Sequence, residues 1–142
     1  MKSSYIKKLF VSAALLGATA LAHADVVVVV ASGSPVSSLT ADQVAQLFTG
    51  KADTFPGGGK AVPIDQAEGS ADRNAFHAKV TGKDAAQLKA YWSKLIFAGK
   101  GQPPKEVASG ADVKKAVAAD PAAIGYLDKS LVDGSLKVVL AP

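Results

Sequence analysis

The sequence DQAEGSADR at positions 65–73 decides how the chain is expected to fold. It follows a short apolar run, Ala61–Ile64, that is typical of a strand, and it precedes Asn74–Val80, which is typical of a helix. Gly69 gives the backbone freedom to turn, and Ser70 is a residue type preferred at a helix N-cap. The stretch therefore predicts a strand-to-helix turn, with the unpaired backbone NH groups and the positive end of the helix dipole at Ser70.

Helix N-termini of this kind are where α/β folds hold small anions, so the turn is the first candidate site. The expected ligands are the NH groups near Ser70, its hydroxyl group and the guanidinium group of Arg73. Ser32 and Ser34 are second candidates, because they follow the first predicted strand and sites in open α/β sheets form at the carboxyl ends of strands. The alternatives are that Ser70 only caps a helix and that the two serines lie in an ordinary turn.

The first 24 residues have the pattern of a signal peptide. Basic residues at the start are followed by an apolar run, Leu9–Leu21, and by the small-x-small sequence Ala22–Ala24. The apolar run is too short for a membrane anchor. We expect cleavage after Ala24, a periplasmic location, and a single α/β domain over Asp25–Pro142; the alternative is a buried N-terminal helix.

Charge and composition exclude several classes of function. The whole chain has 16 basic and 12 acidic residues, but three lysines lie in the predicted leader, which leaves a net charge of +1. This removes the main support for nucleic-acid binding. The absence of cysteine excludes disulfides and thiol chemistry, and it fits a bacterial periplasmic protein better than a disulfide-rich secreted module.

The remaining pattern alternates strands with helices. Val26–Val30 is an unbroken valine run, which predicts a central strand of a parallel sheet with both faces buried. Thr40 and Gln43 have the spacing of a capping box at the start of a helix that ends at Gly50. A longer helix is expected after Asp84, with its apolar face built from four residues and its tryptophan in the core: Leu88, Tyr91, Trp92 and Leu95. A further short strand, a helix and two strands are expected over 105–108, 109–120, 123–127 and 136–140.

No pattern in the chain indicates an enzyme. His77 is the single histidine after the leader, and it is expected to be a partly exposed helix residue. There is no metal-ligand spacing, nucleophile elbow, phosphate loop or dinucleotide fingerprint. We therefore expect no catalytic residue, no metal and no cofactor.

Three segments in order resemble the phosphate-binding proteins of ABC transporters: Leu39–Lys51, Val62–Phe76 and Ala123–Val132. The resemblance implies a type II periplasmic-binding-protein-like fold, in which a mostly parallel sheet is flanked by helices. Full-length members of this family have two lobes that close on the anion, whereas the segments recognised here belong to one lobe.

The anion-binding turn of that family usually reads Arg-x-Asp-Gly-Ser-Gly-Thr. Aligned on Gly69 and Ser70, the chain has changes at four positions: Gln66 for arginine, Glu68 for aspartate, Ala71 for glycine and Asp72 for threonine. The resemblance implies that the anion lies against residues 68–73 and that Glu68 accepts a hydrogen bond from the proton-bearing oxygen of a protonated oxyanion. The loss of arginine removes a two-pronged anion partner, and Asp72 adds a negative charge; Arg73 offers partial compensation.

Two functions follow from these observations. The first is a periplasmic module that binds a small oxyanion, phosphate by default, for ABC-type uptake or sensing. The second is a ligand-free module that has kept the fold and docks on a permease, a membrane sensor or a second copy of itself. A homodimer would restore a closed site by supplying a second lobe. Symmetric pairing is the commonest form of oligomer.

Overall fold

The structure is a computed structural model, and it describes residues 25–142. The predicted leader and its cleavage site after Ala24 lie outside the described residues. The elements of the described chain are, in order, β1 (Val26–Ala31), α1 (Ala41–Phe48), β2 (Val62–Gln66), α2 (Ala71–Val80), α3 (Ala85–Phe97), β3 (Lys105–Val107), α4 (Gly110–Ala119), β4 (Ala123–Asp128), the 3-10 turn η1 (Lys129–Leu131) and β5 (Leu136–Leu140).

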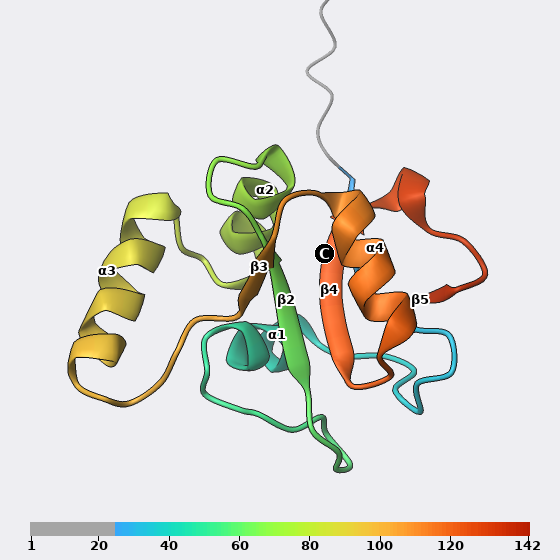
Figure 1. The fold of residues 1–142 in the computed structure, drawn as a ribbon, viewed down its shortest axis with the longest axis horizontal. Helices are drawn as coiled ribbons and strands as arrows, with labels where there is room; N and C mark the ends of the chain where they lie inside the picture. Colours follow the sequence, from blue (N-terminus) through green and yellow to red (C-terminus); the bar gives the residue numbers. More distant parts are fainter. Residues whose placement is uncertain (1–24) are drawn as a thin grey trace, which may run out of the picture.

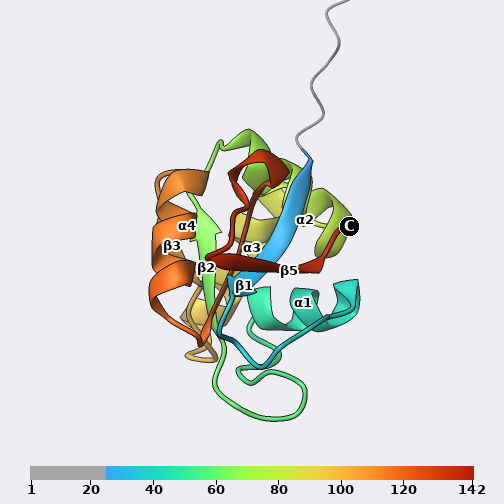
Figure 2. The same cartoon turned by 90° about the vertical axis from the view of Figure 1, so that its right-hand side faces the viewer.

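The strands form one mixed sheet in the order β3-β2-β4-β1-β5 (Figure 1). β2 is parallel to both β3 and β4, whereas β1 is antiparallel to both β4 and β5. Helices α1 and α2 cover one face of this sheet and α4 covers the other, as the edge-on view in Figure 2 shows. The expected class, an α/β fold with a sheet flanked by helices, is confirmed.

The valine strand corrects one detail of the prediction. All six residues of β1 are buried, so the inference that both faces are covered is right. The inference that β1 is a parallel strand is wrong, because its neighbours β4 and β5 both run in the opposite direction. An unbroken apolar run reports burial on both faces, and it carries no information about the direction of the neighbouring strands.

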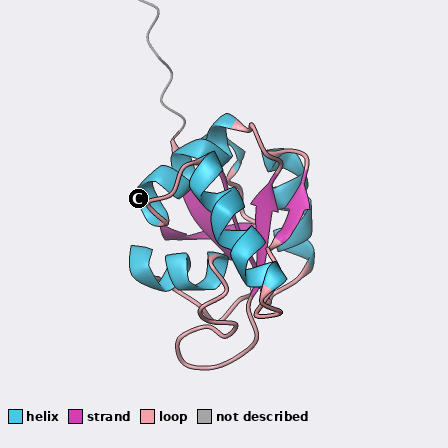
Figure 3. Cartoon of the chain, turned by 90° about the vertical axis from the view of Figure 1, so that its left-hand side faces the viewer, coloured by secondary structure: helices cyan, strands magenta, loops and turns pink. Residues whose placement is uncertain are grey.

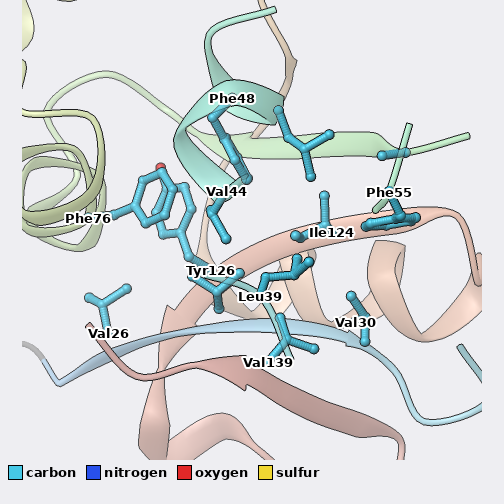
Figure 4. Close-up of a cluster of buried hydrophobic side chains, with 13 residues drawn as sticks. Val26, Val30, Leu39, Val44, Phe48, Phe55, Phe76, Ile124, Tyr126 and Val139 are labelled. Atoms are coloured by element: carbon cyan, nitrogen blue, oxygen red, sulfur yellow. The ribbon is translucent and has the colours of Figure 1, made fainter. Parts of the chain in front are cut away.

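The valines divide the core into two layers, because successive side chains of a strand point to opposite faces. Val26, Val28 and Val30 belong to the layer beneath α1 and α2, which also contains stacked aromatic rings (Figure 4). Val27 and Val29 belong to the layer beneath α4. The strand thus joins the two halves of the core.

Local signals placed the ends of the elements well. Thr40 and Gln43 form the predicted capping box at the start of α1, and Ser70 is the N-cap of α2. The main shift is at β2, which continues two residues beyond the predicted end at Ile64 and so includes Asp65 and Gln66. Both polar residues are buried, which hydropathy alone does not predict.

Helix α3 stands at one end of the molecule, beside the β3 edge of the sheet (Figures 1 and 3). Its buried residues are Leu88 and Trp92, and the expectation that Trp92 is buried is confirmed. The indole ring belongs to neither of the two core layers. It packs instead against the loop at Gly50, where an added Cβ would lie 3.2 Å from the ring. Trp92 therefore fastens α3 to the body of the domain.

The contact between β4 and α4 leaves no room for a side chain at Gly125. A Cβ at this position would lie 2.5 Å from Cγ1 of Val113 and 3.1 Å from Cγ2 of Val117. We expect Gly125→Ala to reduce the free energy of unfolding by about 1–3 kcal/mol, because the helix must move away from the strand. Urea denaturation measures the effect, with Gly33→Ala as the control, since nothing lies within 4 Å of a Cβ at Gly33. Equal stability of the two variants would contradict the tight contact.

Candidate anion-binding site

The predicted turn is present, and its polar groups bond to one another. The backbone at Gly69 is left-handed, with φ +88°, as a glycine-dependent turn requires. The Ser70 hydroxyl accepts a hydrogen bond from the Arg73 amide at 3.3 Å and donates one to Oε1 of Gln66 at 2.8 Å. The side-chain amide nitrogen of Gln66, Nε2, donates in turn to the Tyr126 carbonyl oxygen at 3.0 Å. These bonds hold the start of α2 against the end of β2 and against β4.

Arg73 is the basic residue of the turn, and it lies next to two carboxylates. One guanidinium nitrogen donates to the Gln66 carbonyl oxygen at 2.7 Å and to Oε1 of Glu106 at 2.8 Å, and it lies 3.8 Å from Oδ2 of Asp65. Burial alone would lower the pKa of Arg73, but the charges of Asp65 and Glu106 raise it above its ordinary value. Arg73 is therefore a permanent positive charge. Its partner Glu106 has a half-exposed side chain.

Beneath Arg73 lies a buried polar network centred on Asp65. The carboxylate lies 3.1 Å from Nε2 of His77 and accepts a hydrogen bond from the Tyr126 hydroxyl. Burial favours the neutral acid, but the hydrogen bond and charge of His77, with the bond from Tyr126, hold the pKa of Asp65 below its ordinary value. Burial also raises the pKa of Tyr126, and the charge of Asp65 adds to this effect. The network fixes the end of β2 to α2 and β4.

His77 corrects a prediction. It was expected to be a partly exposed helix residue, yet it is 1% exposed, with its second ring nitrogen 3.0 Å from Oγ1 of Thr81. A helix residue that faces a buried carboxylate cannot be recognised without knowing the position of the strand. In the structure, Phe76 and His77 are the two buried residues of α2.

A cleft of about 200 Å³ lies between the turn and α3. Its walls include Asp65, Glu68 and Arg73 on one side and Lys89 with Trp92 on the other. Glu106 of β3, the Pro103–Pro104 segment and four further residues of α3 complete the lining: Ala85, Leu88, Ser93 and Ile96. Lys89 was not among the predicted site residues, and no local pattern identifies it, because only the packing of α3 brings it to the turn.

The predicted site residues separate into those that line the cleft and those that do not. Glu68 and Arg73 line it, whereas the other residues of the turn do not: Gly69, Ser70, Ala71 and Asp72. Oδ2 of Asp72 lies 3.8 Å from the position that a Cβ would take at Gly110, the first residue of α4. The carboxylate thus lies near the start of a second helix, where a negative charge is favourable.

Ser32 and Ser34 are not brought to the turn. They follow β1, which runs antiparallel to β4, while β4 is parallel to β2. The carboxyl end of β1 therefore lies at the opposite end of the sheet from Gln66. Ser34 is buried there, its hydroxyl accepts from the Val36 amide at 3.2 Å, and its carbonyl oxygen accepts from Nζ of Lys137 at 2.6 Å. The strand-end rule fails for these serines because it applies to strands that run in one direction.

Two further findings concern the described residues. In the part of the chain that the structure describes, residues 25–142, no cluster of three or more His, Cys, Asp or Glu side chains is placed to hold a metal ion. Within the same range, no helix has the length and apolar character needed to span a bilayer.

The sheet order, the helices on both faces and the cleft at the start of α2 define the class of fold as one periplasmic-binding-protein-like α/β lobe. Comparison with known structures agrees. The described fold is similar to that of a protein from Clostridium perfringens assigned as a phosphate ABC transporter substrate-binding protein with bound phosphate, with a TM-score of 0.65 and 26% identity. It is also similar to an ABC-type phosphate transport receptor from Vibrio cholerae, with a TM-score of 0.64 and 18% identity. The similarity to PstS from Borrelia burgdorferi has a TM-score of 0.60 and 14% identity.

These alignments cover 81% of this chain but 44%, 45% and 46% of the three proteins. The chain therefore spans less than half the length of the structures that it matches. No family model matches the sequence, and no curated protein matches it. The structural resemblance to phosphate-transport substrate-binding proteins is confirmed, and it concerns one lobe of their fold.

Proposed function

We propose that the protein is a non-enzymatic binding module for a small oxyanion, phosphate first, which acts in the periplasm in ABC-type uptake or sensing. The observation that carries this proposal is the position of Arg73. Its guanidinium group lies at the first turn of α2, in the wall of the 200 Å³ cleft, with Lys89 on the other wall. The similarity to a structure with bound phosphate supports the same ligand class.

The cleft provides an enclosure that a single lobe was not expected to have. Helix α3 supplies a second wall, and the indole ring of Trp92 and the side chain of Leu88 make part of that wall apolar. An anion between Arg73 and Lys89 would be shielded from water on two sides, which strengthens its attraction to both cations.

The carboxylates of the cleft determine which anions fit. Glu106 already occupies one guanidinium nitrogen of Arg73, so an anion at that nitrogen competes with an internal carboxylate. Glu68 also faces the cleft, and it would repel a fully ionised oxyanion but accept a hydrogen bond from a protonated one. We therefore expect phosphate to bind more tightly than sulfate.

Isothermal titration of the protein with phosphate and with sulfate, after unfolding and refolding to remove carried ligand, tests this proposal. We expect Lys89→Gln to weaken phosphate binding by about three- to tenfold, and Glu106→Gln to tighten it by about tenfold, a free-energy change of about 1.4 kcal/mol. Lys89 is exposed on α3, and Glu106 has a half-exposed side chain, so neither change should disturb the core.

Lys94→Gln is the matched control, since Lys94 lies on the same helix but does not line the cleft. Equal affinities of the Lys89→Gln and Lys94→Gln variants would place the anion elsewhere. In that case the double change Ala71→Gly with Asp72→Thr would show whether the NH groups of α2 are the alternative site.

A second candidate function is a ligand-free interaction module. The observation that favours it is that the turn is already satisfied, because Ser70 bonds to Gln66 and Arg73 bonds to Glu106. The partner would be a permease, a membrane sensor or a second copy of the chain. Absence of heat with either oxyanion at millimolar concentration, for both the unmodified protein and Glu106→Gln, would favour this function.

A further inference from the structure

The two ends of the molecule differ sharply in charge. Residues 83–105, which comprise α3 and the chain on either side of it, contain five lysines and one aspartate, a net charge of +4. The other residues of 25–142 contain eight basic and eleven acidic side chains, a net charge of −3. The overall charge of +1 therefore conceals a basic end and an acidic body.

The most exposed large apolar side chains of the described residues lie at the same basic end. Phe97, the last residue of α3, is 96% exposed, and Ile96 is 53% exposed. Lys94 precedes them by less than one turn, and Lys100 follows the helix. One exposed apolar residue needs no explanation, but here two adjacent ones coincide with the excess of positive charge. We define the α3 tip as Lys94, Ile96, Phe97 and Lys100.

We propose that the α3 tip is a peripheral docking surface for an anionic lipid membrane. Basic amphipathic segments with exposed phenylalanine bind at the membrane interface, where the ring enters the headgroup region and the lysines bind acidic headgroups. The position of α3 at one end of the molecule lets its tip reach a flat surface before the acidic body does (Figures 1 and 3).

Two other occupants fit these observations less well. A second copy paired by two-fold symmetry through the same tip would bring two basic helices together, and their like charges repel. An acidic protein would complement the charge of the tip. All cations of the segment are lysines, however, and lysine is depleted in protein interfaces, where arginine and aromatic residues are enriched. Lysine suits a lipid surface because its long aliphatic stem packs against apolar groups while the ammonium stays in water. Of the four residues of the α3 tip, Ile96 also lines the cleft, whereas Lys94, Phe97 and Lys100 do not. Docking through the last three residues does not require an anion in the cleft.

The chain has no cysteine, so a single introduced cysteine carries a fluorescent label at one known place. Ala98→Cys places an environment-sensitive label beside Phe97, and Ser130→Cys places the same label on η1, near the opposite end of the view in Figure 1. The full chain with each label is mixed with phosphatidylcholine vesicles, with vesicles that also contain phosphatidylglycerol, and with soluble polyglutamate. A local label separates contact at the α3 tip from any contact made by residues 1–24.

We expect the label at position 98 to shift to blue emission with several-fold higher intensity on anionic vesicles alone, and the label at 130 to remain unchanged. Adding Phe97→Ser should abolish the fluorescence response. The double change Lys94→Gln with Lys100→Gln should lower the affinity for anionic vesicles about tenfold. A label at 98 that stays in a water-like environment on anionic vesicles would overturn the proposal. So would an equal response to neutral vesicles, or to polyglutamate.

Discussion

Replacing Asp65 with alanine is expected to reduce the free energy of unfolding by roughly 3–5 kcal/mol, because it removes one member of a buried charged network. The Asp65 carboxylate is the common partner of His77, the Tyr126 hydroxyl and Arg73. Without it, His77 and the Tyr126 hydroxyl keep their burial and lose a hydrogen-bond partner, and Arg73 loses a neighbouring negative charge. The loss of the shared carboxylate is what makes the change so costly. Urea denaturation followed by circular dichroism measures the effect.

Asp53→Ala is the matched control for this substitution, since Asp53 is exposed on the loop before β2. Its loss should change stability by about 0.5 kcal/mol or less. If both variants unfold at the same urea concentration, then the Asp65 network does not hold β2 to α2 and β4, and the polar side chains there are merely tolerated.

The same network predicts how stability depends on pH. The hydrogen bond and charge of His77 hold the pKa of Asp65 in the folded protein below the ordinary value for an aspartate, despite its burial. A depressed carboxyl pKa contributes stability that is present above the unfolded pKa and is lost as pH falls through the folded pKa. The unmodified protein should therefore lose stability below about pH 4, and Asp65→Ala should show a smaller change over the same range. Parallel curves for the two proteins would show that other carboxylates cause the acid sensitivity.

Replacing Phe76 with alanine is the second change with a large expected effect, about 3–5 kcal/mol. The ring is fully buried between α2 and the sheet. Its centroid lies 4.0 Å from that of Tyr126 in a stacked arrangement and 4.8 Å from that of Phe48 in an edge-on one (Figure 4). The substitution leaves a cavity among rings that belong to several elements. The surrounding elements cannot fill this cavity without a shift of α2, which carries Arg73.

The chain contains its own control for this change, because Phe97 is almost fully exposed. Phe97→Ala removes the same atoms from a position that buries almost none of them, so its effect should be within about 0.5 kcal/mol. Thermal unfolding of the two variants in parallel compares them directly. Similar losses at the two positions would contradict the assignment of Phe76 to the core and of Phe97 to the surface.

Several parts of this protein follow from the sequence alone. The α/β class, the turn at 67–70, the Ser70 cap and the capping box at Thr40 all depend on residues that are close together in the chain. Local backbone preferences and the spacing of apolar residues are sufficient for such features. The resemblance to phosphate-transport proteins was also recognised from short ordered segments, and the fold confirms it.

Other parts were decided by tertiary structure, because they depend on residues that are far apart in the sequence. The direction of β1 is set by its antiparallel pairing with β4, about a hundred residues later, and this pairing separates Ser32 and Ser34 from the turn. The burial of His77 depends on Asp65 of β2, and the place of Lys89 in the cleft depends on the packing of Trp92. The sequence thus determined the turn and its cap, and only the packing of strands and helices decided which charges face it.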